Sequence, residues 1–233
     1  MRPVAILRFT PTEGPGHFAE WLDARGIPRR VIAIDEGEPV PGTTDAFSGM
    51  ALMGGPMSAN DALPWIPPVL ALLRSAVTAD VPVIGHCLGG QLLAKALGAE
   101  VTRTPQPEIG WSEVTTTSAP EARRWFGRES FTTFQWHYEV FSLPPGALRV
   151  LTNVVNGEQA YALGKHIGLQ SHLEMTRAMV ETWCRTGAAE LPAQTSGAVQ
   201  SRSDIVRDLD SRLRALVAVA DGVYSHWAAG LLR

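Results

Sequence analysis

The sequence predicts an α/β fold in which a central, mostly parallel (mixed) sheet is flanked by helices, with a helical addition at the C-terminal end. Of the 233 residues, 45% are hydrophobic and 18% charged, enough apolar content for a large core. In the first part of the chain short apolar runs alternate with longer amphipathic stretches, which is typical of a parallel sheet covered on both faces. Further on, β-type runs are separated by turn residues such as Asn156-Gly157, a good hairpin signal.

Each expected element follows from these patterns. Phe18, Trp21 and Leu22 recur at helical spacing, and Pro67 and Pro68 fit the first turn of a helix, where proline is tolerated. The expected strands are Val4–Phe9, Arg30–Ile34, Gly49–Met53, Val81–Gly85, Glu113–Thr117, Phe131–Gln135, Leu148–Val155, Gln159–Leu163 and Ile167–Gln170. The expected helices are Gly16–Arg25, Ile66–Ala79, Leu88–Leu97, Glu174–Cys184 and Asp204–Val219.

The chain is expected to divide into three parts. Residues 1–185 carry the α/β pattern of a single domain. Residues 186–203 are rich in Gly, Ala, Ser, Thr and Gln, which predicts a flexible connection on the surface. Residues 204–233 alternate charges with Leu and Val, which predicts an amphipathic helical extension packed on the same domain.

Charge and composition exclude several function classes. The chain has 20 Lys and Arg against 23 Asp and Glu, a net charge of −3, which argues against a nucleic-acid partner. No run approaches the ~18 uncharged apolar residues of a membrane helix, and the segment before Thr10 is expected to be a strand, not a signal peptide. With only Cys87 and Cys184, no disulfide framework is expected and a cytoplasmic location fits. No His or Cys spacing is typical of zinc, so neither a metal nor a cofactor is expected.

The run around Cys87 carries the strongest chemical signal. A buried strand leads into Gly-x-Cys-x-Gly and then into a helix, the context of a nucleophile in a sharp turn. Such a turn needs residues without Cβ atoms two positions before and after, which are Gly85 and Gly89. The helix that follows favours a thiolate, and the N–H of Leu88 is free to bind an oxyanion. The alternative for Cys87 is a small buried residue at a tight turn.

A second constellation lies far downstream, where His172 and Glu174 follow an apolar strand. Residues two apart in an extended segment share a face, so Glu174 is placed to hold the imidazole of His172 in the tautomer that serves a cysteine as base. A lone histidine at a strand end is more often structural. The presence of the Cys87 motif in the same chain favours the catalytic interpretation.

With these motifs, the sequence resembles a class I (triad-type) glutamine amidotransferase. The matching segments are Gly54-Gly55-Pro56, Gly85-His86-Cys87-Leu88-Gly89-Gly90-Gln91 and Gln170-Ser171-His172-Leu173-Glu174. Two more, Glu108-Ile109-Gly110-Trp111 and Phe134-Gln135-Trp136-His137, resemble stand-alone members related to the glutaminase domain of GMP synthetase. Plant γ-glutamyl peptidases belong to the same neighbourhood. The resemblance covers Val4 to Cys184 and implies a flavodoxin-like sheet.

The resemblance implies a role for each matching residue. It makes Cys87 the nucleophile, His172 the base and Glu174 its orienting partner, with the N–H groups of Gly55 and Leu88 as the oxyanion hole. The residues that it places near the bound substrate are Gly54, Gln91, Trp136, His137, Tyr138 and Glu139. The implied reaction is hydrolysis of the γ-amide of glutamine through a cysteine thioester, with the ammonia released or passed to a separate synthetase.

Two departures from the family pattern concern the substrate more than the mechanism. Leu173 stands where the family usually has proline, and Tyr138-Glu139 replace a Gly-Asp pair. Two alternatives therefore stay open beside the glutaminase. One is a free-standing γ-glutamyl peptide hydrolase, which needs a roomier mouth beyond the scissile bond. The other is a catalytically silent binding protein with the same fold.

Overall fold

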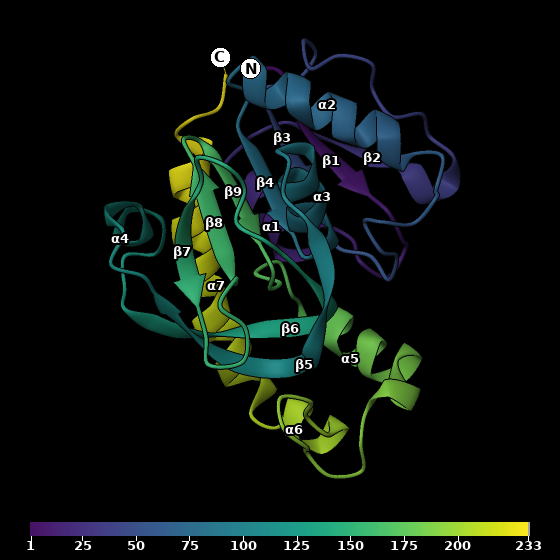
Figure 1. Cartoon of the computed structure of the whole chain (residues 1–233), viewed down its shortest axis with the longest axis vertical. Helices are drawn as coiled ribbons and strands as arrows, with labels where there is room; N and C mark the ends of the chain where they lie inside the picture. Colours follow the sequence, from purple (N-terminus) through teal and green to yellow (C-terminus); the bar gives the residue numbers. More distant parts are fainter. Residues whose placement is uncertain (233) are drawn as a thin grey trace.

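The computed structural model describes residues 1–232, and in them one sheet of nine strands has the order β2-β1-β3-β4-β9-β8-β7-β5-β6 (Figure 1). The strands are β1 (Val4–Arg8), β2 (Arg29–Ala33), β3 (Gly49–Leu52), β4 (Val83–His86), β5 (Val101–Thr116), β6 (Ser130–Phe141), β7 (Leu148–Thr152), β8 (Ala160–Leu163) and β9 (His166–Leu169). From β2 to β9 the neighbours run parallel, and from β9 to β6 they run antiparallel. The predicted α/β fold with a mixed sheet is confirmed.

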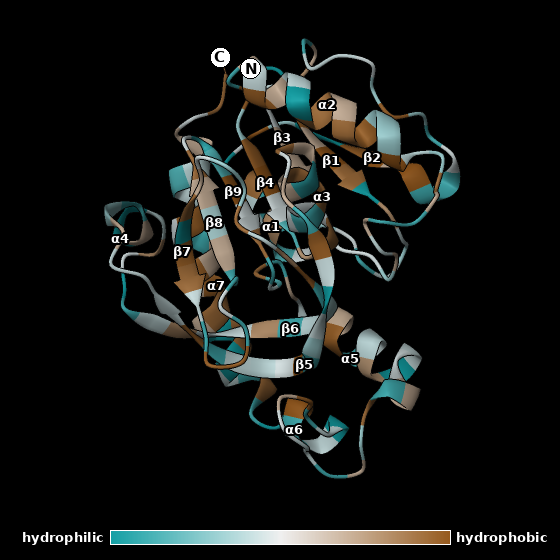
Figure 2. Ribbon diagram, viewed as in Figure 1, coloured by the Kyte–Doolittle hydropathy of each residue, from teal (hydrophilic) through white to brown (hydrophobic). Residues whose placement is uncertain are grey.

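Helices cover both faces of the parallel half. The buried side chains of α1 (Gly16–Ala24) and α7 (Leu209–Ala228) share a core cluster with Val4 and Ile6 of β1. Those of α2 (Ile66–Thr78) and α3 (Leu88–Ala96) share the opposite cluster with Ala5 and Leu7. This alternation is what a strand buried on both faces requires, and Figure 2 shows β1 coloured as predominantly hydrophobic. The carboxyl ends of β1, β3, β4 and β9 therefore meet at one edge.

Strands β5 and β6 form a long antiparallel arm, so the strands predicted at 113–117 and 131–135 are too short. The ladder is irregular between Arg103 and Glu108, and the two prolines of β5 lie inside that irregularity. Proline is tolerated there because no regular ladder hydrogen bond needs its missing N–H. The prolines interrupt the sequence pattern of a strand without interrupting the strand itself.

The remaining helices differ from the sequence prediction in their bounds. They are η1 (Ile34–Glu36), α4 (Pro120–Phe126), α5 (Arg177–Thr186), η2 (Ala188–Glu190) and α6 (Arg202–Val206). Helix α5 begins after the predicted Glu174 because Thr176, in an extended conformation, caps it by accepting from the N–H of Met179. The predicted helix over 204–219 is split because Asp208 has a φ of 53°, and α7 then continues past the predicted end. Helix α4 was not predicted.

The segment 186–203 lies along the β5 arm. The N–H of Ile109 donates to the carbonyl of Ala198 at 3.0 Å, and the N–H of Gln200 donates back to Ile109 at 2.9 Å. The side-chain amide of Gln200 also bonds both backbone groups of Trp111, each at 2.9 Å. These bonds place η2 beside β6. The division of the chain at 185 and 203 stays a prediction.

Candidate active site

Cys87 joins β4 to α3 in a strained turn, with a φ of 49° and a ψ of −110°. A positive φ is rare for a residue with a Cβ atom and is found most often where strain serves a site. A Cβ on Gly85 would collide with the backbone of Gly89, and a Cβ on Gly89 would collide with the backbone of Leu52. The close packing of strand, turn and helix therefore requires both glycines. Cys87 is 5% exposed and lines a cavity.

Two backbone N–H groups beside Cys87 are unpaired. Within residues 1–232, neither Leu88, the first residue of α3, nor Gly55, after β3, donates its N–H to a protein acceptor. The two residues are neighbours, since a Cβ on Gly55 would lie 2.9 Å from Cδ2 of Leu88. Gly54, one residue earlier, also has no room for a Cβ, which would collide with the carboxylate of Glu13 and the ring of His172. The segment after β3 thus packs closely against the residues that follow β9.

His172 and Glu174, which follow β9, form a buried pair. The Nδ1 atom of His172 lies 2.7 Å from Oε1 of Glu174, and the two residues are 1% and 0% exposed. The backbone N–H of His172 donates to the carbonyl of Phe134 on β6 at 2.9 Å, and Trp183 of α5 packs its ring against the imidazole with centroids 4.8 Å apart. The ring is therefore fixed from three sides, with the tautomer set by the bond to the carboxylate.

The electrostatics of the site favour an ionised pair. Burial acts to lower the pKa of His172, but the charges of Glu174 and Cys87 outweigh it and raise that pKa well above its ordinary value. Burial acts to raise the pKa of Glu174, but the charges of His86 and His172 outweigh it and hold that pKa below its ordinary value. His172 is thus suited to stay protonated beside an ionised carboxylate and a thiol that can lose its proton.

A cavity of about 690 Å³ opens over Cys87. Trp136 and Tyr138 of β6 form one side of it and are named here the aromatic wall. The Trp136 indole N–H and the Tyr138 hydroxyl both donate to Oε2 of Glu190 in η2, at 3.0 and 2.7 Å. Trp136 also brings its carbonyl oxygen to 3.9 Å from Sγ of Cys87. The segment after α5 therefore holds the wall in place over the thiol.

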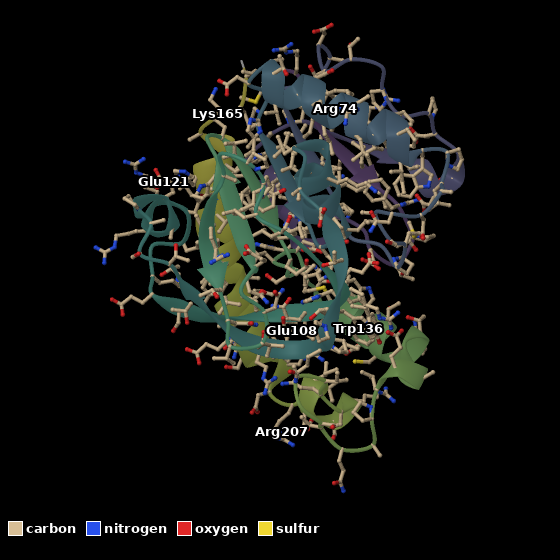
Figure 3. The ribbon with its side chains drawn as sticks, viewed as in Figure 1. Arg74, Glu108, Glu121, Trp136, Lys165 and Arg207 are labelled. Carbon is tan, nitrogen blue, oxygen red and sulfur yellow. The ribbon has the colours of Figure 1, made fainter. Side chains whose placement is uncertain are left out.

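The other residues expected near the substrate have different surroundings. The side-chain amide of Gln91 donates to the backbone carbonyl of Glu139 at 2.9 Å, and the carboxylate of Glu139 accepts from the hydroxyl of Ser58 at 2.7 Å. His137 lines the cavity, but its Nε2 atom lies 3.4 Å from the buried carboxylate of Glu108. Figure 3 shows Glu108 and Trp136 on the neighbouring strands of the arm. Gln91, Glu139 and His137 are thus held by protein partners within the site.

The sequence analysis missed several residues that line the cavity, which are Glu13, Ser58, Arg103, Trp183 and Glu190. Glu13 follows β1, whose carboxyl end lies at the same edge as Cys87, and this rule of parallel sheets could have found it. Burial raises the pKa of Glu13 to about 7, with the charge of Glu174 adding to the rise and that of His172 opposing it. Glu190 and Arg103 had no sequence signal, because only the folded chain brings them to the cavity.

Two searches of residues 1–232 bear on other functions. No group of three or more His, Cys, Asp and Glu side chains in this range is arranged to hold a metal ion. In the same range, no helix combines the length and the apolar character needed to cross a membrane.

Comparison with known proteins decides the family. The model of the family "Glutamine amidotransferase class-I" matches residues 21–181. The chain belongs to the class I glutamine amidotransferase family. The matched range includes Cys87, His172 and Glu174 and ends before α7.

Individual relatives of this amidotransferase chain agree in fold. A glutamine amidotransferase-like protein, YfeJ of Salmonella typhimurium, is 31% identical over 77% of this chain and 78% of its own. A glutamine-hydrolysing GMP synthase of Aeropyrum pernix is 29% identical over 83% of this chain, which spans only 37% of that relative's length. Among solved structures, a glutamine amidotransferase from Methylobacillus flagellatus superposes with a TM-score of 0.97 at 48% identity, over 100% of this chain and 96% of its own.

Proposed function

We propose that this protein is a cysteine-dependent glutaminase that hydrolyses the γ-amide of glutamine. The observation that carries the proposal is the buried His172–Glu174 pair, 2.7 Å apart, beside the strained Cys87 at the first turn of α3. Family membership supports glutamine as the substrate. The arrangement supplies a nucleophile, a proton carrier and an orienting carboxylate, the three groups that acyl transfer through cysteine needs.

In the proposed reaction, the thiolate of Cys87 attacks the γ-carbonyl carbon of glutamine and the carbonyl π electrons move to the oxygen. The free N–H groups of Gly55 and Leu88 support a role as donors to that oxyanion, and losing one such donor typically costs about 2.7–4 kcal/mol. Protonated His172 gives its proton to the departing nitrogen, the carbon–nitrogen bond breaks, and ammonia leaves a thioester. His172 then takes a proton from water, whose oxygen attacks the thioester and releases glutamate and the thiolate.

Glu174 keeps His172 in the correct tautomer throughout this sequence, because its bond to Nδ1 leaves Nε2 for proton transfer. The buried Nε2 atom has no hydrogen-bond partner within residues 1–232 and is therefore available for that task. We propose further that ammonia passes to a separate synthetase chain. The support is that the GMP synthase relatives carry segments this chain does not align with.

A second candidate is γ-glutamyl peptide hydrolysis, and the cavity volume favours it. A volume of about 690 Å³ lies in the range of roughly 300–1,000 Å³ typical of drug-sized ligands, and glutamine is much smaller than such ligands. Arg103 and the aromatic wall line the outer part, where the group beyond the scissile bond would lie. The same Cys87 thioester would form, with an amine or amino acid leaving in place of ammonia.

The test compares ammonia release from glutamine with amine release from a panel of γ-glutamyl dipeptides, for wild type and Cys87→Ala. We expect turnover by the wild type and none by a folded Cys87→Ala variant. Faster turnover of the dipeptides identifies the peptide hydrolase. Labelling with a glutamine-mimicking diazoketone, read by peptide mass, separates both enzymes from a silent binding protein: a folded, reduced protein without an adduct on Cys87 removes the enzyme proposal.

A further inference from the structure

A second histidine lies behind the carboxylate of Glu174. His86, the last residue of β4, is fully buried, and its Nε2 atom lies 3.7 Å from Oε2 of Glu174. The hydroxyl of Tyr224, also fully buried, lies 3.4 Å from the same nitrogen. Glu174 therefore sits between two imidazoles, with His172 on Oε1 and His86 on Oε2.

The unpaired oxygen of Glu174 gives this arrangement a physical reason. Within residues 1–232, Oε2 of Glu174 is buried without a hydrogen-bond partner by strict geometry, and so is Nδ1 of His86. Leaving a buried charged oxygen unpaired is costly, so a donor a few tenths of an ångström beyond normal reach is a strong attraction. The neutral His86 ring with its proton on Nε2 supplies that donor. The other tautomer would turn a lone pair towards the carboxylate, which is repulsive.

The C-terminal helix holds His86 in this orientation. Tyr224 belongs to α7, and its ring meets that of His86 edge-on with centroids 6.1 Å apart. Phe18 of α1 packs against both, at 6.3 Å from His86 and 4.8 Å from Tyr224. The family match ends at residue 181, so the side chain that meets His86 comes from a helix outside the matched range.

We propose that His86, held by Tyr224, is a positioning residue that orients the carboxylate of Glu174. The inference rests on the proposed glutaminase reaction, because Glu174 acts there through His172. With Oε2 held by His86, Oε1 keeps its short bond to Nδ1 of His172, and the imidazolium keeps its partner while Cys87 is a thiolate. Helix α7 is by this account part of the catalytic structure.

The ionisation of the surroundings agrees with a neutral His86. Burial lowers the pKa of His86, the nearby charge of Glu174 opposes this, and the net shift is downward. Burial raises the pKa of Tyr224 well above its ordinary value, so its hydroxyl stays protonated. The titratable side chains around this pair are Glu174 and His172 after β9, Asp221 of α7 and His17 of α1, of which the last two are bonded to each other at 2.7 Å.

The experiment compares His86→Leu, His86→Gln and Tyr224→Phe with the control Tyr161→Phe. Glutamine can place an N–H near the position of Nε2 of histidine, whereas leucine fills space without a donor. The hydroxyl of Tyr161 is equally buried but donates to the carbonyl of Gly90, away from Glu174. Steady-state turnover of glutamine gives kcat and KM, circular dichroism melting verifies folding, and the rate of Cys87 alkylation by iodoacetamide near neutral pH needs no substrate.

We expect His86→Leu to lower kcat about 10–100-fold with KM nearly unchanged, the size of effect that a misplaced catalytic group produces. His86→Gln should recover most of the loss, and Tyr224→Phe should lower kcat about two- to tenfold, the range of one neutral hydrogen bond. Alkylation of Cys87 should slow in the same order. Tyr161→Phe should leave all three readouts unchanged.

Two results would overturn the proposal. One is equal loss in His86→Leu and His86→Gln, which means that the ring acts only by filling space. The other is a folded Tyr224→Phe and a folded His86→Leu with wild-type kcat and alkylation rates. An inactive wild type would count against the proposed reaction instead, and the alkylation rates would still decide whether His86 and Tyr224 act on the Cys87–His172–Glu174 arrangement.

Discussion

Glu13 should make the protein less stable at alkaline pH than it would be with a neutral residue in its place. Its carboxyl group lies against Gly54 and His172 and has no hydrogen-bond partner within residues 1–232, and burial raises its pKa from 4.5 to about 7. Because the folded state holds this proton more tightly than the unfolded state does, the free energy of unfolding falls as pH rises from about 4.5 to about 7 and is level above that.

A shift of roughly 2.5 pKa units corresponds to about 3 kcal/mol, and water reaching the cavity side of this half-buried group reduces the effect to about 1–3 kcal/mol. Replacing Glu13 by glutamine removes the ionisation and keeps the shape. We therefore expect Glu13→Gln to raise the melting temperature by about 2–10 °C near pH 8 and to change it little near pH 5. The control is Glu129→Gln, which removes an exposed carboxyl.

The assay is thermal unfolding followed by circular dichroism at both pH values, with urea unfolding to give free energies. The reasoning is refuted if Glu13→Gln changes stability equally at both pH values, because the effect would then be one of shape or packing. It is also refuted if the variant is less stable than wild type near pH 8. A stabilising result would mean that the folded protein keeps, beside its thiol, a carboxylate that costs it stability.

Three further predictions follow from single contacts. Glu174→Gln should lower kcat by about 10²–10⁴-fold with little loss of fold, because an amide cannot stabilise the protonated ring of His172, and steady-state kinetics with melting curves measures both; activity near wild type would contradict the role of the carboxylate. Gly89→Ala should destabilise the protein by about 1–3 kcal/mol or prevent folding, since its Cβ would collide with the backbone of Leu52, and urea unfolding measures this. Glu190→Gln should lower the pKa of the wall tyrosine below its present value of about 12, which burial and the Glu190 bond together raise, as tyrosinate absorbance on titration would show; an unchanged titration would mean that burial alone sets it.

The parallel half of the fold was predictable because its signals are local. Short apolar runs buried on both faces, each closed by glycine or by an amphipathic stretch, leave few other structures open. The β5–β6 arm was underestimated because two prolines break the pattern of β5 at a place where the ladder is already irregular. The break before α7 depends on the left-handed backbone of Asp208, which no pattern in the sequence marks.

The candidate site divides in the same way. Cys87 was identifiable because a strained turn needs glycines at fixed spacing, and His172 and Glu174 because a short bond needs neighbours two apart. Glu13 and Glu190 were not, because each reaches the cavity from a separate part of the chain and only the tertiary fold brings them together. Local geometry leaves a trace in sequence spacing, whereas a meeting of distant segments leaves none.

Leu173 illustrates how packing can replace a local constraint. Proline at this position would fix φ and limit the segment by its own covalent geometry. Leucine leaves φ free, yet the His172–Glu174 bond is short, so something else fixes the segment. The side chain of Leu173 is fully buried in the same core cluster as Phe134, whose carbonyl accepts from the N–H of His172. A slip of one residue would expose that leucine, at a cost of about 1.5–3 kcal/mol, and force a polar group into the core in its place. Burial of one apolar side chain between two polar ones therefore fixes which side each faces, so the change from proline alters the means of constraint and leaves the geometry intact.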